Sequence, residues 1–190
     1  MRLAASATSG TSLSSLTRLH DLRSCSKSIV GLLYGIALQR GHVPPPEAPL
    51  FSAFPEYAGL ADNDGRDRLT IHHVLTMTMG TDWDESSLLY SDPRNSETAM
   101  DNAADRYRYI LERRVVEPPG AHWTYCGGAT ALLARIIAKG SGKTLHQFAR
   151  ENLFDPLGIG ATEWAVAPMA SRSRHPARAC RCAVWPGSAP

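Results

Sequence analysis

The segment from Asp21 to Arg40 constrains the fold of this 190-residue chain more than any other. It begins Asp-Leu-Arg-Ser-Cys-Ser-Lys-Ser and continues as a mostly apolar run up to Gly41. Leucine, isoleucine, valine and alanine occupy nearly every face of a 3.6-residue period, which is typical of a helix buried on most sides. The sequence therefore predicts a core helix, with the rest of the chain packed around it.

Ser24 and Lys27 lie three residues apart in the first turn of this helix. Side chains at that spacing share one helix face. A lysine in the first turn opposes the helix dipole, so helix stability gives no reason for it. The positive helix end and burial both favour a neutral amine, which can take the proton of a neighbouring serine hydroxyl. The pair indicates a serine nucleophile with a lysine base, although the bare tetrapeptide is also common by chance.

Composition excludes several classes of protein. The chain is 43% apolar and 20% charged, which is ordinary for a globular domain. All 18 acidic residues lie between Asp21 and Glu163, so the net charge of +2 comes from basic ends rather than from a patterned basic face. We therefore expect no nucleic-acid partner. The sequence gives no indication of oligomeric state.

No apolar run reaches the length needed to span a membrane. Residues 1–20 also lack the continuous apolar segment of a secretory signal. We therefore expect no membrane partner and a cytoplasmic location for the chain as written, while export of a full-length ancestor stays open.

The cysteines and histidines do not predict a metal site. The four cysteines, at positions 25, 126, 180 and 182, lack the spacing of a disulfide framework or a zinc site. His72 and His73 are adjacent and therefore point in different directions, which argues against a shared ion. The sequence predicts no metal ligand.

Gly140 to Thr144 looks like the end of a phosphate-binding loop, but Ile137 stands where that pattern requires glycine. Thr144 and Gln147 instead have the spacing of a helix capping box. This segment therefore predicts a joint between two helices and no nucleotide cofactor.

Two further features lie in loops or at loop ends. Residues 81–95 form a polar loop that contains Trp83 and Tyr90, and long loops with aromatic and acidic groups often line pockets, although a solvated loop with one docked tryptophan is commoner. Tyr125 stands at a second junction between a loop and a helix, just before Gly127. Tyr125 could equally be an anchored core residue.

The remaining chain predicts helices over 71–79 and 102–116, and further helices that begin at 129 and 145. Residues 1–18 are expected to be a poorly ordered leader. Residues 166–190 contain no acidic residue and no apolar period, so we expect this tail to be either disordered or translated out of the ancestral frame.

Four segments together resemble the serine β-lactamase-like and penicillin-binding-protein-like hydrolases, and within them the class C and aminohexanoate-dimer hydrolase branch. The resemblance spans about residues 19–165, and the segments occur in the family's order. They are His20–Ser28, Leu75–Gly80, Trp123–Gly128 and Phe154–Ile159.

The resemblance implies that Ser24 attacks an acyl carbon, that Lys27 accepts its proton and that Tyr125 passes the proton to the leaving group. The backbone N–H of Ser24 would supply part of the oxyanion hole. The substrate would be a small amide or ester, cleaved through an acyl-enzyme, and Trp83, Tyr90 and Gly127 are candidate substrate-binding residues.

The chain departs from the family in three ways. Gly127 stands where many relatives have asparagine, which favours small amides or esters over β-lactam antibiotics. The family's third motif, Lys or His followed by a small residue and Gly, is absent, and the chain has no room for the sheet segments before the nucleophile and after the helical region. We therefore expect a mainly α chain that corresponds to the helical lobe of the α/β β-lactamase/transpeptidase-like fold, with most of the sheet lobe missing.

Such a chain would be a weakly active or inactive fragment of a serine hydrolase. The alternative is a non-catalytic helical interaction module derived from the same fold.

Overall fold

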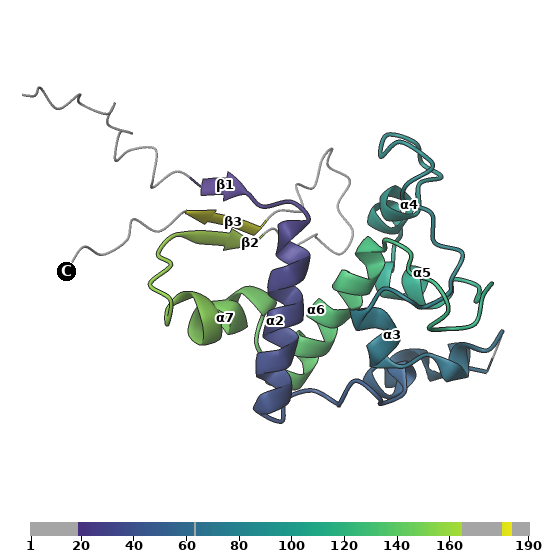
Figure 1. Ribbon diagram of the computed structural model, residues 1–190, viewed down its shortest axis with the longest axis horizontal. Helices are drawn as coiled ribbons and strands as arrows, with labels where there is room; N and C mark the ends of the chain where they lie inside the picture. The colour runs from purple at the N-terminus through teal and green to yellow at the C-terminus, as the bar shows by residue number, and fades with distance from the viewer. Residues whose placement is uncertain (1–18, 63, 165–179, 184–190) are drawn as a thin grey trace, which may run out of the picture.

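A computed structural model describes residues 19–62, 64–164 and 180–183 of the chain. Within them the protein is mostly helical, with helices gathered around a central pair and a small sheet at one end (Figure 1). The predicted fold class, a helical lobe with most of the sheet lobe missing, is confirmed. The helices in chain order are α2 (Cys25–Gln39), η1 (Leu50–Ala53), η2 (Pro55–Leu60), η3 (Arg66–Arg68), α3 (Ile71–Leu75), α4 (Ser96–Asn102), α5 (Arg106–Leu111), α6 (Gly127–Ser141), α7 (Leu145–Ala149) and η4 (Arg150–Phe154).

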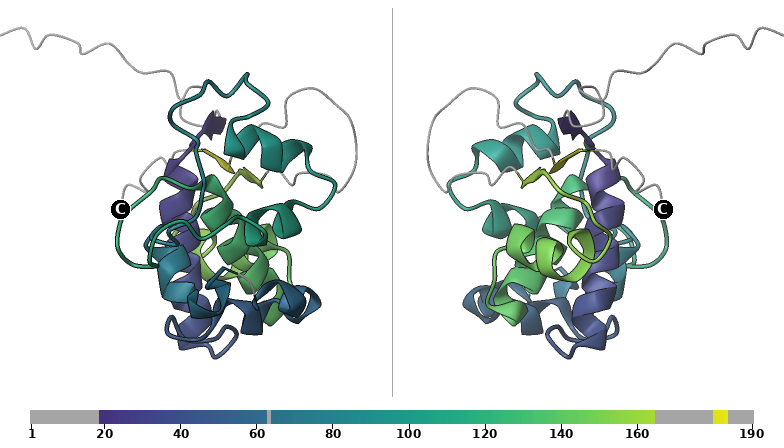
Figure 2. Two further views of the ribbon diagram at one scale, coloured as in Figure 1. Left: turned by 90° about the vertical axis from the view of Figure 1, so that its right-hand side faces the viewer. Right: turned by 90° about the vertical axis from the view of Figure 1, so that its left-hand side faces the viewer.

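The central pair consists of α2 and α6, which pack against each other and remain adjacent when the molecule is turned (Figure 2). The α2 helix buries one stripe, formed by Val30, Leu33, Tyr34 and Ala37. This corrects the expectation of a helix buried on most sides, because Leu32 is 54% exposed. The spacing of the buried positions is that of an amphipathic helix with a single core face. The predicted core helix therefore exists, but one of its sides is open.

Two other helix predictions are wrong in their boundaries. The helix predicted over 71–79 ends at Leu75, because Met77 takes a left-handed backbone conformation with φ of 54°. The helix predicted over 102–116 is shortened to α5, and α4 forms just before it in a segment for which the sequence predicted no helix; each of the two begins after a capping side chain. Asn95 caps α4 and Asp105 caps α5, and each accepts hydrogen bonds from two backbone N–H groups of the first turn.

The joint after α6 forms as the sequence predicts. Gly142 ends α6 in the left-handed region, with φ of 68°. Thr144 and Gln147 form the capping box of α7, in which each side chain bonds the other's backbone N–H. Lys143 pairs with Glu151. The segment is thus a turn between two helices.

A three-stranded antiparallel sheet lies beside the N-terminal end of α2 (Figure 1). Its strands are β1 (Leu19–Asp21), β2 (Thr162–Trp164) and β3 (Cys180–Ala183), in the order β1-β3-β2. Leu19 is paired with Ala183, and Thr162 with Cys182. The expectation that the chain has no room for sheet segments before the nucleophile and after the helical region is therefore wrong. Strands of three or four residues are too short to show an alternating pattern in the sequence.

The leader predicted over 1–18 lies outside the described residues, and so does most of the tail predicted over 166–190. Of that tail the structure describes only β3. Among the helices of the described residues, none is both long and apolar enough to cross a bilayer.

Candidate active site

The first part of the site is the turn that leads from β1 into α2. Arg23 has a φ of 47°, in the left-handed region that residues with a side chain rarely adopt. Asp21 holds this turn, because its Oδ1 accepts a hydrogen bond from the Arg23 backbone N–H at 2.9 Å and its Oδ2 lies 3.0 Å from the Arg23 guanidinium. The turn places Ser24 at the N-cap of α2, where its side chain makes no capping hydrogen bond to the helix. The hydroxyl is thus available for other contacts.

Lys27 lies one turn further along α2, on the same side as Ser24. Its Nζ lies 3.4 Å from the Ser24 Oγ, within reach of a hydrogen bond. The same Nζ lies 4.9 Å from the centroid of the Tyr125 ring, a distance that permits a cation–π contact. The amine therefore faces both the hydroxyl and the phenol.

Tyr125 reaches the site through a loop that is held by the segment after α3. The backbone N–H of Thr124 donates to the carbonyl of Met77 at 2.9 Å, and the N–H of Gly120 donates to that of Thr78 at 2.8 Å. Gly80 has a φ of 67°, and a Cβ there would lie 2.4 Å from the carbonyl oxygen of Glu117. Only glycine permits that close approach of the two loops. The segment from Leu75 to Gly80 thus fixes the path of the chain that carries Tyr125.

The hydroxyls of Ser24 and Tyr125 meet at 2.5 Å, and either can be the donor. The Ser24 Oγ is therefore in contact with the Lys27 amine on one side and the Tyr125 phenol on the other. The structure brings together the three residues that the sequence singles out from two loop-to-helix junctions 101 residues apart. A hydroxyl between an amine and a phenol is an arrangement that can lose its proton to a base and attack an acyl carbon.

The start of α6, which follows Tyr125, is tightly packed. Cys126 is the N-cap, and its Sγ accepts a hydrogen bond from the Ala129 N–H at 3.3 Å. Burial raises the pKa of the Cys126 thiol to about 12, so it stays neutral at ordinary pH. A Cβ on Gly127 would lie 1.9 Å from the Glu97 carboxylate, and one on Gly128 would lie 2.9 Å from the Trp83 ring. The packing at the start of α6 thus leaves no room for a side chain at Gly127 or Gly128.

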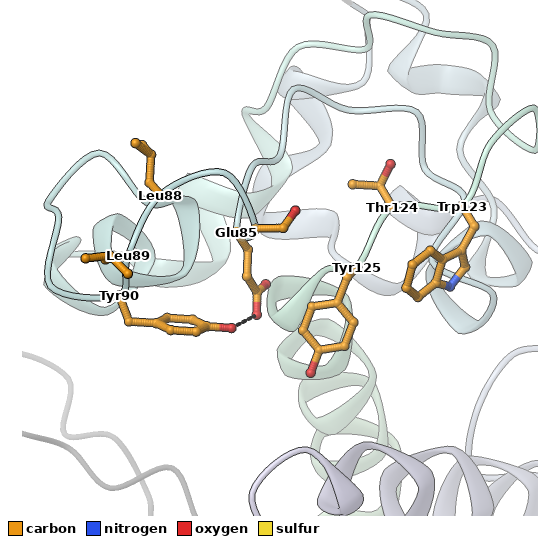
Figure 3. A pocket seen from close by; sticks show the side chains of 8 residues that line it. Glu85, Leu88, Leu89, Tyr90, Trp123, Thr124 and Tyr125 are labelled. Atoms are coloured by element: carbon orange, nitrogen blue, oxygen red, sulfur yellow. Dashed lines mark hydrogen bonds between the residues drawn. The ribbon is translucent and has the colours of Figure 1, made fainter.

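A pocket of about 730 Å³ opens beside Tyr125 (Figure 3). Its two sides come from the loop after Trp83 and from the irregular segment that ends at Tyr125. Leu89, which is 78% exposed, and Trp123 stand at its rim. The lining residues are Glu85, Ser86, Leu88, Leu89, Tyr90, Trp123, Thr124 and Tyr125.

The three candidate substrate-binding residues occupy different places. Tyr90 lines the pocket, and its ring points toward Glu85 (Figure 3). Trp83 is only 4% exposed and packs against Tyr109 with ring centroids 6.3 Å apart, so it lies in the core rather than on the pocket surface. Gly127 is buried as the first residue of α6. One side chain connects all three, and sequence reasoning did not single it out.

That side chain is Glu85. Its Oε2 accepts hydrogen bonds from the indole N–H of Trp83 at 2.9 Å and from the backbone N–H of Gly127 at 2.7 Å. Its Oε1 accepts one from the Tyr90 hydroxyl at 3.1 Å. The sequence contains a weak signal for this role, because Glu85 is an acidic residue between two aromatic ones in a loop expected to line a pocket.

His73 has a structural role at the start of α3. The His73 Nδ1 accepts a hydrogen bond from the Thr70 backbone N–H at 3.1 Å and so caps α3. Burial lowers the pKa of His73, which favours the neutral ring that can accept this bond. Among the residues that the structure describes, no three or more histidine, cysteine or acidic side chains are grouped closely enough to hold a metal ion.

Comparison with known proteins gives a match over nearly the whole chain. The model of a family described as Beta-lactamase matches residues 5–181. The curated protein monacolin J acid methylbutanoyltransferase of Aspergillus terreus is 27% identical over 154 residues, which are 73% of this chain and 36% of that protein.

Solved structures agree in fold. A protein from Bacillus anthracis assigned as a 6-aminohexanoate-dimer hydrolase has a TM-score of 0.68 and 17% identity, over 89% of this chain and 45% of its own. The D-amino acid amidase from Ochrobactrum anthropi SV3, in complex with L-phenylalanine, has a TM-score of 0.57 and 22% identity, over 79% of this chain and 38% of its own. This chain spans less than half the length of each of these three proteins.

Proposed function

Because this chain belongs to the beta-lactamase family, we propose that it is a serine hydrolase in which Ser24 attacks small amides or esters and forms an acyl-enzyme. One observation carries the proposal. The Lys27 Nζ lies 3.4 Å and the Tyr125 hydroxyl 2.5 Å from the Ser24 Oγ. A nucleophile within hydrogen-bond reach of its base is the geometry that nucleophilic catalysis requires.

The reaction has two halves. In the first, the Ser24 Oγ forms a bond to the acyl carbon and Lys27 takes the hydroxyl proton, while the C–N or C–O bond of the substrate breaks as Tyr125 gives a proton to the leaving group and regains one from Lys27. In the second, water attacks the acyl carbon, the ester bond to Ser24 breaks, and one proton of the water passes to the Ser24 oxygen. The oxygen and the remaining proton of that water stay with the released acid, so no other reactant is needed.

The charge that develops on the acyl oxygen needs hydrogen-bond donors. The backbone N–H of Ser24 lies at the start of α2, where the helix dipole also favours negative charge. Each such donor matters, because losing one lowers the rate by roughly 10²–10³.

The proposed substrate class follows from the pocket and from the relatives. Leu88, Leu89 and Trp123 offer apolar surface beside Tyr125, and Gly127 has no side-chain amide to bind a β-lactam. The names of the similar proteins describe an amidase, a dimer hydrolase and a methylbutanoyltransferase. These points favour a small, largely apolar acyl group. Tyr90 would line its pocket, and Trp83 and Gly127 would hold the pocket residue Glu85 in place through their hydrogen bonds.

A fluorophosphonate probe tests the proposal, because it reacts with activated serines. We expect peptide mass spectrometry to find the adduct on Ser24 in the wild-type protein and no adduct in Ser24→Ala. Ser28→Ala is the matched control, since Ser28 is exposed one turn away and lies outside the site, and it should label as the wild type does. A folded wild-type sample that stays unlabelled contradicts the proposal and supports the non-catalytic helical interaction module.

A further inference from the structure

We infer that Glu85 is a positioning residue for Tyr125, and this inference rests on the proposed function. Glu85 does not reach the reacting hydroxyl itself. It acts through the backbone of Gly127, two residues after Tyr125, and it couples the wall of the pocket to the phenol of the site.

The first step is the burial of the carboxylate. Glu85 is only 5% exposed, and acidic side chains are rarely so buried unless they are fully hydrogen-bonded. Three donors meet that need, from Trp83, Gly127 and Tyr90. The 2.7 Å bond from the Gly127 N–H is the shortest of the three. The carboxylate is therefore built into the loop as an acceptor.

The second step is the position of Gly127. It is the first residue of α6, and its N–H is one of the N-terminal groups for which the helix itself has no acceptor. Glu85 supplies that acceptor. Tyr125 is therefore held on both sides, by the bond from Thr124 to Met77 before it and by the bond from Gly127 to Glu85 after it.

The third step is the effect of losing this acceptor. The start of α6 is closely packed, because a Cβ on Gly127 would lie 1.9 Å from the Glu97 carboxylate and one on Gly128 would lie 2.9 Å from the Trp83 ring. If the acceptor at Glu85 is removed, the buried Gly127 N–H loses the partner that holds it in place, which is unfavourable, and the chain at Gly127 shifts toward another acceptor. A shift of the chain at Gly127 moves Tyr125, and displacement of a catalytic group by about 1 Å can cost roughly 10²-fold in rate.

Two substitutions of Glu85 by side chains of similar size show whether its hydrogen bonds position Tyr125 or whether it only fills space. Glu85→Gln keeps an oxygen that can accept from both Trp83 and Gly127, and its amide can donate to the Tyr90 oxygen. Glu85→Met fills similar space with no strong acceptor. We expect the rate of Ser24 labelling by the fluorophosphonate to fall roughly 10²-fold in Glu85→Met and to stay close to wild type in Glu85→Gln.

Arg66→Met controls for loss of stability. Arg66 is also a buried charged side chain that anchors a loop, through the carbonyls of Glu112 at 2.8 Å and Arg113 at 3.1 Å, but it makes no contact with the site. At a temperature where each variant is folded, Arg66→Met should label at the wild-type rate. Equal rates in Glu85→Met and Arg66→Met would overturn the inference.

A second readout does not depend on activity. The chain has three lysines, and Lys27 and Lys139 each lie over an aromatic ring, at 4.9 Å from Tyr125 and 5.2 Å from Phe54. In an NMR spectrum of the lysine ε-methylene groups, we expect the ring-current shift of Lys27 to disappear in Glu85→Met and to persist in Glu85→Gln. The signal of Lys139 should not change in either variant.

The two readouts distinguish the failure of each claim. If the wild-type protein is folded but unlabelled, the proposed hydrolase function fails, and the Lys27 signal still reports on Glu85. If the Lys27 signal of Glu85→Met equals that of the wild type, Tyr125 has not moved and the positioning inference is wrong, whatever the labelling shows.

Discussion

At the scale of single residues, the site depends on the hydroxyls of Ser24 and Tyr125, between which a proton can pass directly. The Ser24 Oγ and the Tyr125 hydroxyl are 2.5 Å apart, and the Lys27 Nζ is 3.4 Å from the Oγ. The phenol is therefore as well placed as the amine to exchange a proton with the nucleophile. Removal of the phenol hydroxyl should slow the reaction without disturbing the fold, since Tyr125 is only half-buried.

We predict that Tyr125→Phe lowers the rate of Ser24 labelling by about 10²–10⁴, the range for loss of a general acid–base group. The ring stays, so its contact with Lys27 and the unfolding transition should be kept. Tyr57→Phe is the matched control, because its hydroxyl donates to Asp105 at 2.8 Å far from the site. If Ser24 is labelled at the same rate in Tyr125→Phe as in Tyr57→Phe, the Tyr125 hydroxyl takes no part in the reaction.

Cys25 and Cys126 should differ sharply in reactivity although both are free thiols. Burial raises the pKa of Cys126 to about 12, so almost none of it is thiolate near pH 7, whereas Cys25 is exposed. We predict that iodoacetamide alkylates Cys25 in the folded protein and leaves Cys126 unmodified until urea unfolds the chain. Equal modification of the two thiols in the folded protein, measured by peptide mass spectrometry, would contradict the packing described at the start of α6.

Site residues were predictable from the sequence where they belong to a short motif with a fixed spacing. Ser24 and Lys27 share a helix turn, and the resemblance of the motif around Tyr125 added the third partner. Glu85 was not predicted, because its partners are a backbone N–H 42 residues away and two ring substituents in its own loop. Trp83 was expected near substrate and lies in the core, since composition alone does not tell which side of a loop faces inward.

At the scale of the elements, α2 carries both the nucleophile and a large part of the core. Leu33 is fully buried against the rest of the protein, whereas its neighbour Leu32 is 54% exposed. The two positions offer the same side chain in opposite environments.

Leu33→Ala should therefore lower the free energy of unfolding by about 2–5 kcal/mol, the usual cost of a large-to-small change in a core. Leu32→Ala should change it by about 0.5 kcal/mol or less, as most surface substitutions do. Urea unfolding followed by circular dichroism measures both. Similar losses in the two variants would mean that the exposed side of α2 is covered in solution.

Asn95 joins a helix to the pocket loop. Its Oδ1 accepts from two N–H groups of α4, and its Nδ2 donates to the carbonyls of Leu88 at 2.9 Å and Glu85 at 3.2 Å. Asp105 caps α5 in the same way but is exposed and has no bond to the pocket loop.

We predict that Asn95→Ala costs about 2–4 kcal/mol of unfolding free energy, from a lost cap and buried carbonyls that lose their donor. Asp105→Ala should cost about 0.5–2 kcal/mol, the value of a cap. Hydrogen exchange of residues 85–92 should accelerate only in Asn95→Ala. If exchange of residues 85–92 also accelerates in Asp105→Ala, then Asn95 does not specifically anchor the pocket loop.

The presence of a helix was predictable more often than its exact start and end. The capping box of Thr144 and Gln147 is local, and it was predicted correctly. The helix α4 was not predicted and α5 is shorter than predicted, because the starts of both depend on Asn95 and Asp105, which are as common in loops as at caps. The early end of α3 follows from the left-handed Met77, whose conformation is set by its contact with the chain before Tyr125.

At the scale of the whole molecule, two helices that are far apart in sequence form the axis of the fold and carry the two halves of the site at one end. The sheet lies at that same end of α2 (Figure 1). The mainly helical class was predictable from apolar periodicity and from the family resemblance. The sheet was not, because β3 pairs with strands about 160 and 20 residues away and has no pattern of its own.

The central claim is that these helix ends form an acyl-transfer site, and a chromogenic ester such as p-nitrophenyl butyrate tests it most directly. We predict a burst of p-nitrophenolate close to one equivalent of protein, together with a butyryl adduct on the peptide that contains Ser24, and neither in Ser24→Ala. A folded wild-type protein that shows no burst and no adduct, or an adduct that persists in Ser24→Ala, would contradict the account.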